Sequence, residues 1–194
     1  MRYRYKEAFG KKDVYDSTGM LVGHVDDMAF SFGPPHPEIV AVAVHMPWTE
    51  QIGPYRLVRP VDDIVLLLPW RQVTGFDEER VMLEGEFPSF DLVTAEGLLF
   101  LKQDVIDKQI VDDEGNRLQR VDDVILSDAD GILRVETLYL GMTWLPSGIH
   151  LKKVLERLTR EAKAVEEVDE IPWELVGNVD RDTDILTLKP LVKP

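Results

Sequence analysis

The chain has 194 residues, of which 44% are hydrophobic and 30% charged, and this apolar content excludes an intrinsically disordered chain. Its 22 basic and 36 acidic residues give a net charge of −14, which repels phosphate backbones and argues against direct binding to nucleic acid. No Cys is present, which excludes disulfides and thiolate metal sites, and the longest purely apolar run (residues 39–44) is far shorter than the ~20 residues of a membrane span. We therefore expect a folded cytoplasmic protein without direct membrane insertion.

The first half of the chain is predicted to form short β-strands separated by tight turns. Residues 13–16 form a short strand that ends at Ser17-Thr18-Gly19, a segment typical of turns. The strands that follow combine β-branched and large apolar residues, which favour extended structure. They are a longer strand through Leu21, Val25 and Phe30, then residues 38–46, 56–58 and 64–68.

The second half repeats the first. When the sequence is shifted by 96 residues, Lys12–Trp48 aligns without a gap on Lys108–Trp144, and nine of these 37 positions are identical. Average residue usage predicts roughly two identities. The turn recurs at residues 113–116, and a strand recurs at 134–142. The chain is therefore predicted to be an internal duplication, with repeats at residues 1–95 and 96–194 and a small barrel or sandwich in each.

All four tryptophans take part in this duplication. Trp48 aligns with Trp144, and Pro69-Trp70 aligns with Pro172-Trp173 at an offset of 103 residues. Their presence in both copies favours core packing over ligand binding. The residues predicted to be structural are Gly19, Gly115, Trp48, Trp144, Trp70 and Trp173.

The second repeat also contains an inserted segment with helical spacing. Leu151, Val154, Leu155 and Leu158 lie on one face, with charged residues on the other, and this pattern predicts an amphipathic helix near residues 150–167. We expect the helix to pack on its own repeat, and a docking surface for a partner is the alternative.

Pairs of adjacent aspartates are the most prominent polar feature. The candidates for a weak divalent-cation site are Asp26, Asp27, Asp122 and Asp123, because hard cations prefer oxygen ligands. However, neighbouring residues on a strand point to opposite faces, so two adjacent carboxylates cannot both ligate one ion. We therefore expect structural or solvated carboxylates and no tight metal site.

The sequence contains no recognisable catalytic arrangement. Its four histidines lack zinc-site spacing and do not recur between the repeats, and no nucleophile elbow or phosphate-binding loop is present. We expect no catalytic residues and no cofactor, and no pocket that combines a histidine with two carboxylates.

The segment VIDKQIVDDEGNRLQRVDDV at residues 105–124 resembles the opening of a PRC-barrel domain, and residues 11–28 are a weaker version of it. This resemblance implies small β-barrels that act through protein contacts and carry no catalytic residues. Two such barrels in tandem, with IPWELV at residues 171–176, resemble the N-terminal region of MgtE-like proteins, in which the barrels precede an MgtE intracellular domain and CBS domains.

We therefore expect an all-β fold of two tandem PRC-type barrels related by duplication, with one helix inserted in the second. The resemblance implies a non-enzymatic protein-interaction or regulatory module with a protein partner, as the N-terminal part of an MgtE-like magnesium-handling or CBS-domain protein. The alternatives are a free-standing PRC-barrel adaptor in RNA or ribosome metabolism, like the maturation factor RimM, and a weak divalent-cation sensor.

Overall fold

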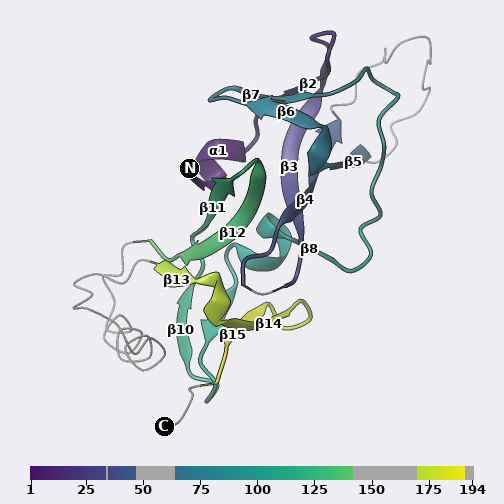
Figure 1. Cartoon of the computed structure of the whole chain (residues 1–194). Coiled ribbons are helices and arrows are strands. Elements are labelled where there is room, and N and C mark those ends of the chain that lie inside the picture. The colour runs from purple at the N-terminus through teal and green to yellow at the C-terminus, as the bar shows by residue number, and fades with distance from the viewer. Residues whose placement is uncertain (34, 47–63, 142–169, 191–194) are drawn as a thin grey trace.

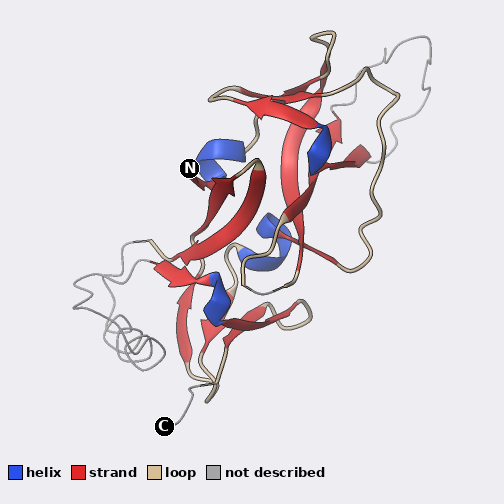
Figure 2. Ribbon diagram, in the orientation of Figure 1, coloured by secondary structure: helices blue, strands red, loops and turns tan. Residues whose placement is uncertain are grey.

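A computed structural model describes residues 1–33, 35–46, 64–141 and 170–190, and these residues are mainly β (Figures 1 and 2). The prediction of a mainly β fold is confirmed. Trp48, Trp144, the strand predicted at 56–58 and the helix predicted near 150–167 lie outside the described residues. Among the described residues, no helix has the length and apolar composition that a membrane crossing requires.

The first half forms one curved sheet. Its strands lie in the order β5-β4-β3-β2-β7-β6, and β8 from the second half also pairs with β3. The elements are β1 (Arg2–Arg4), α1 (Tyr5–Phe9), β2 (Asp13–Tyr15), β3 (Leu21–Ser31), β4 (Ile39–Met46), β5 (Ile64–Pro69), the 3₁₀ helix η1 (Trp70–Gln72), β6 (Val73–Phe76) and β7 (Arg80–Leu83).

The second half forms two four-stranded sheets, ordered β1-β11-β12-β13 and β10-β9-β15-β14. Its elements are β8 (Leu98–Phe100), the π-helix η2 (Leu101–Val105), β9 (Gln109–Val111), β10 (Arg117–Arg120), β11 (Asp123–Ala129), β12 (Ile132–Tyr139), β13 (Glu170–Pro172), the 3₁₀ helix η3 (Trp173–Leu175), β14 (Val176–Asp180) and β15 (Ile185–Leu188).

The strand pairings of the two halves follow the same register. In the first half Asp13 lies opposite His24, and in the second Gln109 lies opposite Arg120, each residue 96 positions further along the chain. The β3–β4 and β11–β12 pairs show the same offset. Both also contain a register shift at equivalent positions, after Ala29 in β3 and after Ile125 in β11. In both halves the short strand after the helix also runs parallel to the last strand, as β2 does to β7 and β9 to β15.

The first strand of each half pairs with the sheet of the other half. Strand β1 pairs antiparallel with β11, and β8 pairs antiparallel with β3. Buried residues of both halves, among them Phe30, Val42, Leu126 and Leu138, accordingly form one hydrophobic cluster. Because burial of this shared apolar surface is the main source of stability, the two halves stabilise each other.

The described strands do not close into barrels. Strands β5 and β6 are the two edges of the first sheet, and only the three residues of η1 separate them in sequence. Strands β13 and β14 are joined by η3 in the same way. Pro69 and Pro172 immediately precede these helices, and a proline cannot donate the backbone hydrogen bond that a continued ladder requires. The edge strands β5 and β6, and likewise β13 and β14, are therefore joined by a short helix. In the expected barrel, hydrogen bonds between neighbouring strands would close the sheet.

Candidate functional site

The two Asp-x-x-Gly turns have almost the same internal geometry. Asp16 Oδ1 accepts hydrogen bonds from the backbone N–H groups of Thr18 and Met20, both at 2.9 Å. Gly19 follows at φ +82°, in the left-handed region where a β-carbon is strained. Burial raises the pKa of Asp16, but the hydrogen bonds that it accepts outweigh this effect and hold its pKa below the ordinary value.

A turn of the same form lies in the second half. Asp112 Oδ1 accepts hydrogen bonds from the N–H groups of Glu114, at 3.0 Å, and Asn116, at 2.7 Å, and Gly115 has φ +83°. The structure thus places Gly19 and Gly115 at the positions where these turns require a residue without a β-carbon.

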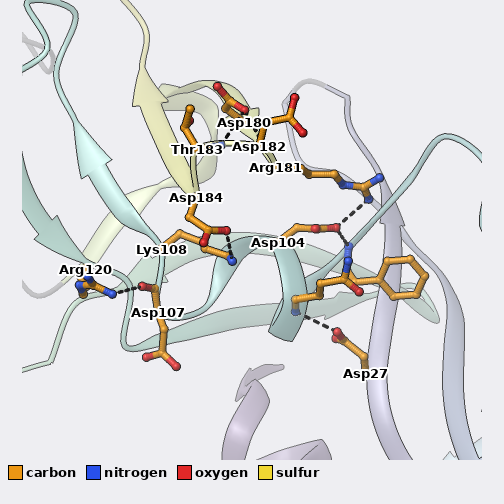
Figure 3. A network of polar contacts seen from close by, with 12 residues as sticks. Asp27, Asp104, Asp107, Lys108, Arg120, Asp180, Arg181, Asp182, Thr183 and Asp184 are labelled. Carbon is orange, nitrogen blue, oxygen red and sulfur yellow. Dashed lines mark hydrogen bonds and ion pairs between the residues drawn. The ribbon is translucent and has the colours of Figure 1, made fainter.

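The second aspartate of the pair at 26–27 holds the helix of the other half. Asp27 Oδ1 accepts hydrogen bonds from Met28 N at 2.7 Å and from Lys102 N at 2.8 Å, and Oδ2 accepts one from Gln103 N at 3.0 Å. Figure 3 shows Asp27 below the start of η2. Because Lys102 and Gln103 belong to the first turn of η2, the carboxylate satisfies N–H groups that have no partner within that helix.

Asp123 makes the reciprocal contact. It accepts hydrogen bonds from Val124 N at 2.8 Å and from Lys6 N, in α1, at 3.2 Å. Burial raises the pKa of Asp27 and of Asp123, and in both residues the backbone hydrogen bonds oppose this rise. Each half therefore presents a buried carboxylate to the helix that enters from the other half.

The first aspartate of each pair has a different partner. Asp26 lies 2.8 Å from Lys102 Nζ, and Asp122 lies 3.5 Å from Lys6 Nζ. The weak metal candidates therefore divide into two buried helix-binding carboxylates and two surface ion pairs. Within the described part of the chain, no three His, Asp or Glu residues are grouped so as to hold a metal ion.

A second polar network was not indicated by the sequence. The buried Asp104 in η2 accepts hydrogen bonds from Phe100 N and from Arg181 Nη2, both at 2.7 Å (Figure 3). Lys108 forms an ion pair with Asp184 nearby. The contacts of Arg181 and Asp184 attach the β14–β15 turn to η2 and to the segment that follows it. They join residues almost eighty positions apart, a separation at which no local pattern indicates a contact.

The described tryptophans pack against aromatic rings. Trp70 contacts Phe9 edge-on, with ring centroids 5.8 Å apart. Trp173 is buried and contacts Phe30 edge-on at 5.3 Å. Both begin a 3₁₀ helix that directly follows a proline, and edge-on contacts of this kind add to the stability gained from burial.

A pocket of about 640 Å³ lies where α1 and η2 meet β2, β3 and β4. Its lining includes His24, His45, Asp13 and Asp26, so the prediction that no pocket combines a histidine with two carboxylates is wrong. The cause is the strand register, because His24 lies directly opposite His45 on β4 and opposite Asp13 on β2. Spacing along the chain does not reveal such a row across three strands.

Gly23 allows β3 and β4 to approach each other beside this row. A β-carbon at Gly23 would lie 2.3 Å from the carbonyl oxygen of His45, which is closer than real contacts permit. His24 Nδ1 lies 2.7 Å from Asp13 Oδ1, and the Tyr15 hydroxyl lies 3.3 Å from Asp13 Oδ2. The three side chains therefore form one hydrogen-bonded chain on the outer face of the sheet.

The same outer face carries an exposed apolar row. Tyr15 lies opposite Leu21 on β3 and opposite Met82 on β7, so the three side chains share one face. Leu21 is 44% exposed and Met82 39% exposed, whereas Val14 and Val81, which precede Tyr15 on β2 and Met82 on β7, are buried in the core. A second hollow of about 590 Å³ borders Tyr15 and Met82.

Comparison of the sequence with models of known protein families finds no match, and comparison with curated proteins finds none.

Proposed function

We propose that the chain is a non-enzymatic protein-interaction module of two tandem PRC-barrel-type repeats that arose by duplication. The shared 96-residue offset in sequence and in strand register supports the duplication. The resemblance of residues 105–124 and 171–176 supports the PRC type, and a cytoplasmic role as the N-terminal part of an MgtE-like magnesium-handling or CBS-domain protein.

The observation that carries the interaction role is the row of Leu21, Tyr15 and Met82, in which Leu21 and Met82 are exposed and Tyr15 is half-buried. Contact of adjoining apolar side chains with water is unfavourable, and such patches on a sheet face are typical of binding surfaces. Asp13 and Arg80 lie next to the row on the same strands and give it a polar border. An apolar centre with a polar border is the usual arrangement of a protein–protein interface.

The second half shows that the fold itself does not require this row. The residues paired in the same way there are Val111, Arg117 and Thr187, of which Val111 is buried and Arg117 is charged. The apolar row is therefore a property of the first half alone. With a net charge of −14, the surrounding surface favours a partner whose own border is basic.

The proposal is tested by comparing the proteins captured by three forms of the full chain. The first is the wild type, the second carries Leu21→Glu with Met82→Glu, and the third carries Leu92→Glu with Ile132→Glu. Leu92 and Ile132 are also exposed but lie outside the row, so the third form controls for added charge. We expect one set of proteins to be captured by the wild type and the control and lost from the row variant. Capture of the same proteins by all three forms would contradict the proposal.

A further inference from the structure

We propose that His24 and His45 form a binding site for a borderline transition-metal dication such as Ni²⁺ or Zn²⁺, independently of the protein-interaction role. The two histidines are direct partners across the antiparallel β3–β4 pair. Residues in this relationship have β-carbons ~4.5–5.5 Å apart and project from the same face. Both imidazoles are half-buried and line the pocket of about 640 Å³.

Asp13 fixes the orientation of His24. An ionised carboxylate can only accept hydrogen bonds, so the contact of 2.7 Å makes His24 Nδ1 the donor and leaves Nε2 with its lone pair. A histidine whose second ring nitrogen donates to a carboxylate is the usual arrangement at protein metal sites. The Tyr15 hydroxyl, 3.3 Å from the other oxygen of Asp13, holds the carboxylate in turn. The site requires only one of the two ring nitrogens of His45 as a metal ligand.

The surroundings suit a hydrated cation. The pocket has room for the water molecules that complete the coordination of an ion with two protein ligands. Two of the lysines that line it, Lys6 and Lys102, form ion pairs with Asp122 and Asp26, so part of the positive charge at the pocket is neutralised. The chain as a whole carries −14, which concentrates cations near its surface.

The donor set selects the metal. Imidazole nitrogen suits Ni²⁺, Cu²⁺ and Zn²⁺, whereas Mg²⁺ requires oxygen ligands in near-octahedral geometry. The equivalent positions in the second half are Gln109, Arg120 and Gly141, which supply no imidazole. We therefore expect one site per chain.

The test uses tag-free, metal-free full chain titrated with NiCl₂ and ZnCl₂ in a calorimeter. We expect saturable binding of one ion per chain, lost in His24→Gln and in His45→Gln and unchanged in His36→Gln, which alters a histidine outside the pocket. Asp13→Asn should weaken binding at least tenfold, the usual effect of losing such an orienting carboxylate. Circular dichroism of each metal-free variant checks that the fold is retained. Asp13 is confirmed as a positioning residue if affinity falls while the spectrum is unchanged.

A second readout locates the ion. Ni²⁺ is paramagnetic, so it should broaden the imidazole resonances of His24 and His45 first and leave those of His36 sharp. The proposal is overturned if the wild type shows no saturable binding of either metal. It is equally overturned if the His24→Gln, His45→Gln double variant binds Ni²⁺ as the wild type does.

Discussion

Glu38 and Arg134 face each other across an antiparallel bridge, with Arg134 Nη2 3.1 Å from Glu38 Oε1. They are equivalent positions, 96 residues apart in the chain. On a twofold axis between two identical repeats, each residue would meet its own copy, and a charged side chain would meet a like charge. Here the two aligned residues carry opposite charges, and the contact is an ion pair.

The first prediction concerns this pair. Glu38→Arg places two like charges together and should lower the free energy of unfolding by about 1 kcal/mol, a modest figure because both side chains are partly exposed. The exchange Glu38→Arg with Arg134→Glu should restore most of this loss, since it re-forms the pair in reverse. Urea unfolding of the three proteins measures the effect. A double variant as unstable as the single one would show that charge does not determine this contact.

The second prediction separates the two members of an aspartate pair. Asp27→Ala leaves three N–H groups, one buried and two partly buried, without their acceptor and should cost about 3 kcal/mol of unfolding free energy. Asp26→Ala removes only a partly exposed ion pair with Lys102 and should cost less than about 1 kcal/mol. Amide hydrogen exchange at Lys102 and Gln103 should accelerate in the first variant only. Equal losses in the two variants would contradict the assigned roles.

The third prediction follows from the lowered pKa of Asp16. Because the folded state holds this carboxyl ionised more strongly than the unfolded chain does, its stabilising contribution is complete above the ordinary Asp pKa of about 3.9. The contribution is lost as pH falls through the lowered folded pKa. Asp16→Asn should therefore be about 2 kcal/mol less stable than the wild type at pH 7, and this difference should shrink below about pH 4. A difference that stays constant down to pH 2 would exclude the carboxylate charge as its source.

The fourth prediction tests the two strands, β1 and β8, that each pair with the sheet of the other half. A protease site inserted at Thr94–Glu96, in the exposed connection before β8, allows the folded chain to be cut between its halves. The cut protein should elute from a size-exclusion column as one species, because β1 remains paired with β11 and β8 with β3. It should separate only in denaturant. Separation of the fragments in native buffer would show that the pairing of β1 and β8 does not hold the halves together.

The sequence predicts those parts of the fold that depend on local chemistry. The turns at Gly19 and Gly115 and the strands around them follow from residue type and repetition. The pairing of β1 and β8 with the sheet of the other half could not be predicted in this way. Strand β1 reads Arg-Tyr-Arg, whereas β8, at the equivalent position, reads Leu-Leu-Phe, with no residue in common. The row of Asp13, His24 and His45 depends on the alignment of three strands, which only tertiary packing sets.

The pairing of β1 with β11 also constrains how the protein is made. The ribosome synthesises Arg2 before Ser127, its partner in the sheet, which emerges more than a hundred residues later. The end of β3 at Ala29–Ser31 likewise lacks one of its neighbours until Leu98–Phe100 has been added. Proteins often fold domain by domain from the N-terminus during translation. In this chain the first half cannot complete its strand pairing ahead of the second, and its unpaired strand edges stay exposed until β8 and β11 have been made.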